Sequence, residues 1–161
     1  MEAQITIEYG DIQTVAADCI VNAANSGLRE GSGVCGAIFA AAGREEMTRA
    51  CRAIGRCAVG SAAATPGFRL PAKWVIHAVG PYTSLPDAPE KLRSAYRSAL
   101  DIAREKGCRT AAFPLISSGV FNDAPMDYRR CGAARSPPSA AGRRITRTAR
   151  WTCASSATAA A

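Results

Sequence analysis

Hydrophobic and polar residues follow two different periods along the first 127 residues of the chain. Continuous or alternating β-prone runs predict strands at 4–9, 19–22, 73–79 and 109–115. Apolar residues spaced three and four apart predict helices at 34–42, 44–54 and 88–106. A stretch of small residues at 60–70 predicts a short edge strand. Because strands and helices alternate, the pattern predicts an α/β fold with a mixed sheet.

Polar or glycine-rich loops follow the predicted strands, at 10–12, 22–27, after His77, and at 117–121. In α/β folds, ligands bind at the carboxyl ends of strands. The richest loop carries Asn22 and Asn25 and then Gly27, Gly31 and Gly33 before the helix at 34–42, whose first turn contains a fourth glycine, Gly36. Glycines let the backbone approach a ligand, and the helix N-terminus offers free N–H groups to an anion. The loop therefore predicts a phosphate site with amides placed for sugar hydroxyls; a flexible connection is the alternative.

Charge and cysteine content narrow the class of protein. The chain has a formal net charge of +7, but residues 1–127 contain equal numbers of acidic and basic residues. All of the excess lies in 128–161, so the folded part has no net charge to favour nucleic acid. Seven cysteines form no CxxC pair, which indicates reduced thiols. With no predicted signal peptide or membrane span, we expect a cytoplasmic monomer.

The loop sequences together resemble the macrodomain family, the ADP-ribose-binding three-layer α/β/α fold. GDI at 10–12, VNAAN at 21–25, GSGV at 31–34, HAVGP at 77–81 and FPLISSGVF at 113–121 match its motifs in the family's order. The resemblance covers roughly residues 4–127. It implies one domain over 1–127, with ADP-ribose or an ADP-ribosylated protein as the partner and no cofactor or metal.

The resemblance also implies a role for each matching residue. Asp11 resembles the acid that accepts the adenine amino group, and Ile12 its neighbour that helps specify the base. Asn22 and Asn25 resemble asparagines that line the distal ribose. The remaining binding residues fall in two phosphate loops: first Gly33, Val34 and Cys35, then Ser117, Ser118, Gly119, Val120 and Phe121, with Phe121 against the distal ribose.

Activity is a separate question from binding. The resemblance implies hydrolysis of ADP-ribosyl esters, such as O-acetyl-ADP-ribose or mono-ADP-ribosylated protein, with Asn25 as a catalytic residue. In the hydrolytic branch an aspartate is common at the position of Cys35 and a histidine at that of Phe39, and both are replaced here. Cys35 as a nucleophile at a helix N-terminus is an alternative, but a packing cysteine is favoured. His77 is interpreted as a hydrogen-bonded structural histidine.

Residues 128–161 differ from the rest of the chain. They contain seven arginines, no acid, and no Leu, Val or Phe. This composition predicts a disordered, non-native tail that supplies no core element. The resemblance would place a further helix and a closing strand here, so we expect the sheet to lack both. A shifted reading frame would explain the change, because a shift across 150–158 permits an alternating sequence such as VDVRFVSD.

Two classes of function therefore stay open. The first is a macrodomain that binds ADP-ribose and hydrolyses an ester of it. The second is a binding-only ADP-ribose reader, or a fold-defective product, which the residues at positions 35 and 39 and the tail would favour. Nucleic-acid binding by the arginine-rich tail is a distant third.

Overall fold

The structure is a computed structural model that describes residues 3–124 and 147–153. Its strands are β1 (Ala3–Tyr9), β2 (Cys19–Ala24), β3 (Ala62–Pro66), β4 (Trp74–Val79), β5 (Thr110–Pro114) and β6 (Arg147–Cys153). Its helices are η1 (Ile12–Thr14), α1 (Gly33–Ala42), α2 (Arg44–Ile54) and α3 (Ala88–Glu105). The predicted α/β fold is confirmed, and the helices predicted from periodicity agree to within one residue at each end.

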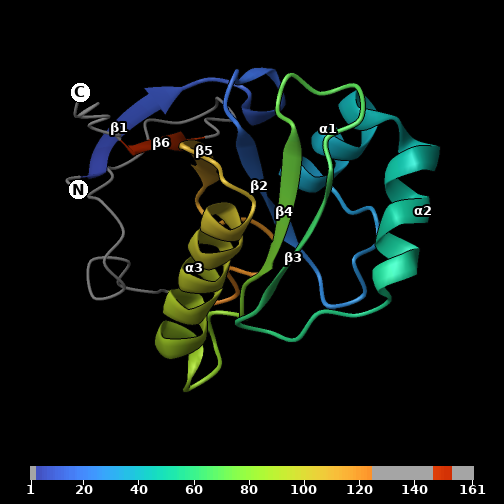
Figure 1. Cartoon of the computed structure of the whole chain (residues 1–161). Coiled ribbons are helices and arrows are strands. Elements are labelled where there is room, and N and C mark those ends of the chain that lie inside the picture. Colours follow the sequence, from blue (N-terminus) through green and yellow to red (C-terminus); the bar gives the residue numbers. More distant parts are fainter. Residues whose placement is uncertain (1–2, 125–146, 154–161) are drawn as a thin grey trace.

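The elements form three layers around one mixed sheet (Figure 1). The strand order is β1-β6-β5-β2-β4-β3, with β2 parallel to both β4 and β5. Helices α1 and α2 cover one face, and α3 covers the other. Successive residues of β2 divide between these faces, since Ile20 belongs to the core on the α1 side and Val21 to the core on the α3 side.

The last strand corrects an expectation from the sequence. Arg147–Cys153 forms β6, which pairs antiparallel with both β1 and β5, so the closing strand of the sheet is present. The expectation was wrong because strand pairing uses backbone N–H and C=O groups, which a segment poor in apolar residues still carries. The further helix and most of the tail would lie within 125–146 and 154–161, outside the described residues.

One stripe of β1 stays open to solvent. Ile5, Ile7 and Tyr9 alternate along the strand and are 65%, 48% and 65% exposed. None of the described helices covers them (Figure 1). An alternating apolar strand normally packs one face against the core, so this stripe marks a face of the sheet with no apolar layer over it in the described part of the chain.

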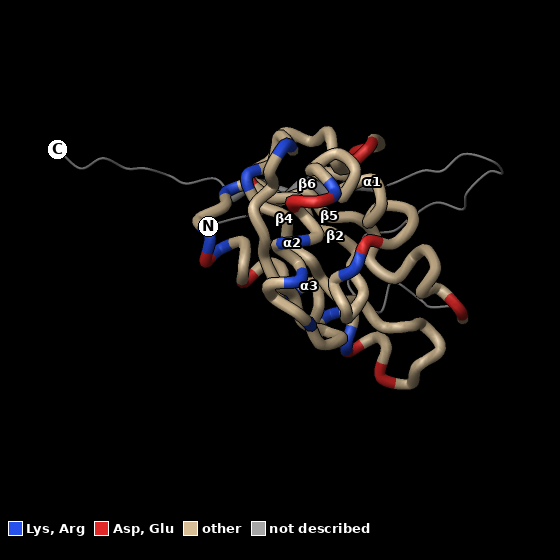
Figure 2. Tube along the Cα trace, turned by 90° about the vertical axis from the view of Figure 1, so that its right-hand side faces the viewer, with Lys and Arg blue, Asp and Glu red and all other residues tan. Residues whose placement is uncertain are grey.

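The described surface carries both signs of charge around the molecule (Figure 2). Lysines and arginines are interspersed with aspartates and glutamates instead of gathering on a single face. Within residues 3–124 and 147–153, no helix has the length and apolar character needed to cross a membrane.

Candidate functional site

The sheet topology brings the four predicted loops to one edge. Because β2 runs parallel to β4 and β5, the loops that follow these three strands leave from the same side. β1 is antiparallel to β6, and β6 is antiparallel to β5, so β1 also ends at this edge. The segment 10–14 that follows β1 therefore joins the loops after the other three strands, as the sequence predicted.

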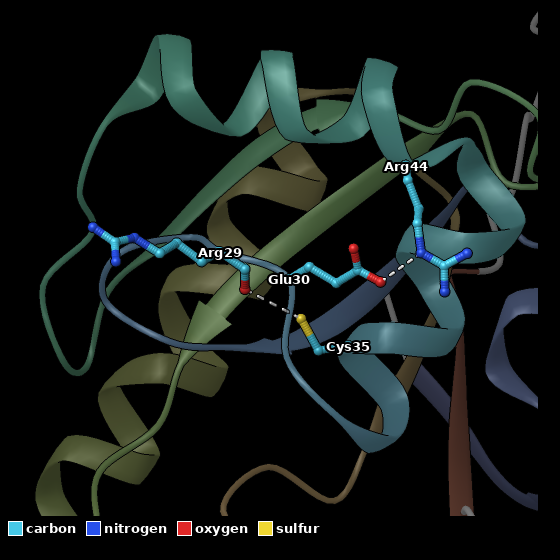
Figure 3. A network of polar contacts seen from close by, with 4 residues as sticks. All are labelled: Arg29, Glu30, Cys35 and Arg44. Atoms are coloured by element: carbon cyan, nitrogen blue, oxygen red, sulfur yellow. Dashed lines mark hydrogen bonds and ion pairs between the residues drawn. The ribbon is translucent and has the colours of Figure 1, made fainter.

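The glycine-rich loop is held by Asn25. Its Nδ2 donates to the Arg29 carbonyl at 2.8 Å, and its Oδ1 accepts from the Arg29 N–H at 3.0 Å. Leu28 takes a positive φ of 51° and buries its side chain, which anchors the middle of the loop in the core. Glu30 pairs with Arg44 of α2 at 2.8 Å on the surface (Figure 3). Asn25 thus shapes the loop from the end of β2.

The glycine-rich loop leads into α1, whose N-terminus has no side-chain cap. Gly33, the first residue of α1, has a φ of +61°, a conformation that favours glycine. Ser32 makes no side-chain capping bond, and the first turn of α1 contains no acid. At Gly36, a Cβ would lie 2.6 Å from the Gly31 carbonyl oxygen, so the loop can fold onto the helix only with glycine there. The free N–H groups of this turn suit an anion.

Cys35 lies in the first turn of α1 but faces inward. The residue is 6% exposed, its thiol donates to the Arg29 carbonyl at 3.7 Å, and it accepts from Asn22 Nδ2 at 3.5 Å (Figure 3). Reactive cysteines are normally at least partly exposed, whereas this sulfur is enclosed by protein groups. This geometry favours the packing interpretation of Cys35 over the nucleophilic one.

Asn22 lies in the core, which differs from the expected ribose contact. It has no exposed surface, and its Nδ2 contacts His77 Nδ1 at 3.0 Å as well as the Cys35 sulfur. Its Oδ1 is buried and has no hydrogen-bond partner among residues 3–124 and 147–153. Asn22 and His77 are neighbours in the β2–β4 register, so both side chains point to the α1 side of the sheet. Asn22 therefore connects the first turn of α1 to β4 beneath the glycine-rich loop.

His77 is a structural histidine, as predicted. Its Nε2 lies 3.0 Å from Thr65 Oγ1, and the Thr65 hydroxyl donates to Met47 Sδ at 3.3 Å. With Asn22 donating to Nδ1, the neutral tautomer with a proton on Nε2 satisfies both contacts. Burial lowers the pKa of His77 to about 4. Phe39 stands edge-on to the ring, with centroids 6.3 Å apart, and belongs to the same core.

The second loop, residues 117–121, follows β5. Ser117 takes a positive φ of 60°, and its hydroxyl donates to the Pro81 carbonyl at 2.7 Å. Gly80 packs so closely on Ser117 and Ile116 that a side chain there would collide with both. Ser118 donates to the Leu115 carbonyl at 2.7 Å. Residues 118–120 are exposed, so their backbone is open at the sheet edge beside the glycine-rich loop.

Aromatic and acidic side chains flank the two loops. The rings of Tyr82 and Phe121 lie 4.5 Å apart between centroids. Asp11 is exposed, and its side chain does not cap η1, which leaves the carboxylate available to a ligand. Ile12 is buried in the core at 1% exposure, so a ligand would meet its backbone first.

A family comparison identifies this arrangement. The model of the macro domain family matches residues 21–130. The chain belongs to the macro domain family. It is similar to the Macro domain-containing protein RSc0334 of Ralstonia nicotianae, with 50% identity over 118 residues that cover 72% of this chain and 68% of the relative.

The chain is also similar to one protein named for an activity on ADP-ribose and to one solved structure that contains ADP-ribose. ADP-ribose glycohydrolase MACROD1 of Bos taurus is 48% identical over 124 residues, which cover 75% of this chain and 38% of that protein. The solved macrodomain of Trypanosoma brucei in complex with ADP-ribose is 38% identical, with a TM-score of 0.65 over 70% of this chain and 47% of that one.

The sequence did not reveal two contacts of this macro domain. Thr65 was not assigned as the partner of His77, and Asp123 was not paired with Ser84, whose hydroxyl donates to its carboxylate at 2.7 Å. Neither contact has a local signal. Thr65 lies 12 residues from His77, and Asp123 lies 39 residues from Ser84.

Proposed function

We propose that this macro domain binds ADP-ribose. The observation that carries the proposal is the meeting of an uncapped helix N-terminus and an exposed second loop at one edge of the sheet. Backbone N–H groups from two such loops can neutralise a diphosphate without arginines. The exposed Asp11 carboxylate is at the same edge, where it can accept a hydrogen bond from the adenine amino group.

The known relatives support the same ligand. One similar solved macrodomain holds ADP-ribose, and one relative is named as an ADP-ribose glycohydrolase. We assign Asp11 and Ile12 to the adenine end, the α1 N-terminus at Gly33, Val34 and Cys35 to the first phosphate contact, and residues 117–121 to the second. Of the two asparagines, Asn25 stays assigned to the distal ribose.

Titration calorimetry with ADP-ribose, AMP and ADP tests the binding proposal. ADP-ribose should bind more tightly than AMP, because AMP lacks the second phosphate that residues 117–121 would contact. It should also bind more tightly than ADP, because ADP lacks the distal ribose that is assigned to Asn25 and Phe121. Equal affinity for AMP and ADP-ribose would remove the second loop from the site. No heat from any of the three ligands would refute the proposal.

We further propose that the domain hydrolyses ADP-ribosyl esters, with O-acetyl-ADP-ribose or mono-ADP-ribosylated protein as the substrate. Water would attack the ester and release the acid and free ADP-ribose. The chain's own contribution is to hold the ligand. The glycine-rich loop does so in the shape that the Asn25–Arg29 hydrogen bonds give it, together with the backbone N–H groups of both loops. Cys35 is buried against the Arg29 carbonyl and supplies no carboxylate that could orient the water.

A binding-only reader is the second candidate, and Cys35 and Phe39 favour it. Both side chains are buried, and neither offers a carboxylate or an imidazole to a water molecule. Release of acetate from O-acetyl-ADP-ribose by the wild type separates the two candidates. Cys35→Asp should raise this turnover by about a hundredfold, the lower end of the range that a positioned acid–base group contributes.

Cys35→Ser is the matched control for that substitution, since it replaces the thiol with a hydroxyl of similar size and adds no carboxylate. It should leave turnover near the wild-type value. If Cys35→Asp folds, binds ADP-ribose and gains no activity, position 35 does not limit catalysis in this chain. A wild type that releases neither acetate nor ADP-ribose favours the reader.

A further inference from the structure

The second loop is attached to the segment after β4 at both of its ends. At its start, the Ser117 hydroxyl donates to the Pro81 carbonyl at 2.7 Å. At its end, the Thr83 N–H donates to the Phe121 carbonyl at 2.9 Å. Among the described hydrogen bonds, none joins the exposed residues 118–120 to the segment after β4. The position of the loop therefore depends on its two ends.

Asp123 secures the second of these attachments. Its Oδ1 accepts from the Ser84 N–H at 2.8 Å, and its Oδ2 accepts from Ser84 Oγ at 2.7 Å. The single proton of the Thr83 hydroxyl has the Ala124 carbonyl oxygen at 2.7 Å as its nearest acceptor, with Asp123 Oδ1 at 3.1 Å. Thr83 Oγ1 also accepts from the Ala124 N–H at 2.9 Å. The hydrogen bonds from the Ser84 hydroxyl and N–H lower the pKa of Asp123, so the carboxylate is ionised near neutral pH. The Asp123 side chain thus joins two loops through the two donors of Ser84.

We propose that Asp123 is a positioning residue that sets the second loop for the part of ADP-ribose beyond its first phosphate. The inference rests on the proposed function. Phosphate binding by backbone N–H groups requires the loop to keep its shape before the ligand arrives, because ordering a loose loop on binding costs free energy. Asp123 supplies that order from outside the loop and touches neither the glycine-rich loop nor Asp11 in the described contacts.

The assignment predicts a selective loss of affinity. Asp123→Ala removes both bonds from Ser84, so it should weaken ADP-ribose binding by about tenfold, the size expected for losing charge-assisted hydrogen bonds. Binding of AMP should stay within about twofold, because AMP ends before the second loop. Asp123→Asn keeps one acceptor oxygen and should lie between the wild type and the alanine variant.

A suitable control is Asp87→Ala. Asp87 is exposed, follows the same strand β4, and makes no side-chain capping bond to α3, so the variant loses the same charge nearby without losing a contact between the loops. It should bind ADP-ribose and AMP like the wild type. If it weakens ADP-ribose as much as Asp123→Ala does, the effect is one of net charge and the positioning role is wrong.

Hydrogen exchange on the free protein tests the attachment without any ligand. In Asp123→Ala, the amides of Ser84 and of residues 117–122 should exchange faster, while those of α1 should not change. Unaltered exchange, or an equal loss of AMP and ADP-ribose affinity, overturns the assignment. A wild type that binds no ADP-ribose refutes the proposed function and the positioning role, whereas the exchange data then still report whether Asp123 joins the two loops.

Discussion

Acidification should destabilise this domain through His77 before its carboxylates are protonated. His77 is the only histidine in the chain, and it lies fully buried between Asn22 and Thr65. Burial lowers its pKa from 6.5 to about 4. The folded state therefore keeps the imidazole neutral at a pH where the unfolded chain has already protonated it. Stability from this group is complete above the unfolded pKa and is lost as the pH falls from 6.5 toward 4.

The size of the effect follows from the two pKa values. Once the pH is below both of them, the gap between 6.5 and about 4 corresponds to about 3 kcal/mol of unfolding free energy. Between about pH 7.5 and about pH 5, linkage gives a loss of about 2 kcal/mol. The pKa of Asp18, lowered from 3.8, and that of Glu46, lowered from 4.5, place the contributions of those carboxylates below this window.

Urea unfolding at a series of pH values measures this loss directly, with tryptophan fluorescence and circular dichroism as the two signals. His77→Gln is the control, because an amide has no proton to gain in this range and its unfolding free energy should vary little with pH. If that variant does not fold, the single histidine can be titrated in the wild type by proton NMR. A histidine signal of the folded protein that titrates near its ordinary pKa would refute the reasoning.

Three further predictions concern the site and the tail. Asp11→Ala should weaken ADP-ribose binding by about 1 to 3 kcal/mol in calorimetry, the cost of losing a hydrogen bond to a charged group, and an unchanged affinity would remove Asp11 from the site. Asn25→Ala should lower ester turnover while the melting curve stays cooperative, because the variant loses the two hydrogen bonds to the Arg29 backbone that hold the shape of the glycine-rich loop. Equal turnover would show that these bonds do not contribute to catalysis. We also propose that residues 128–161 result from a shifted reading frame. Restoring that frame should raise the melting temperature and lower dye binding at the exposed Ile5, Ile7 and Tyr9, and no gain in either measurement would contradict it.

Much of this domain could be predicted from local patterns in the chain. Residue spacing located α2 and α3 because each has one buried face, and that face repeats every three to four residues. Continuous β-prone runs located β2, β4 and β5, because strands that are buried on both faces carry apolar residues at successive positions. The glycine-rich loop was recognisable because an anion site at a helix N-terminus requires small residues in a fixed order along the chain.

Tertiary structure decided what depends on contacts between distant segments. β6 takes its place because β1 and β5 leave backbone groups for it to pair with, and backbone pairing has no signature in apolar content. Asn22 turns to the core because its register neighbour in β4 is His77, whose ring needs a donor. Asp123 meets Ser84 because β4 and β5 both lie beside β2 and end at the same edge. The order of strands in the sheet, set by the packing of the whole chain, places these side chains together.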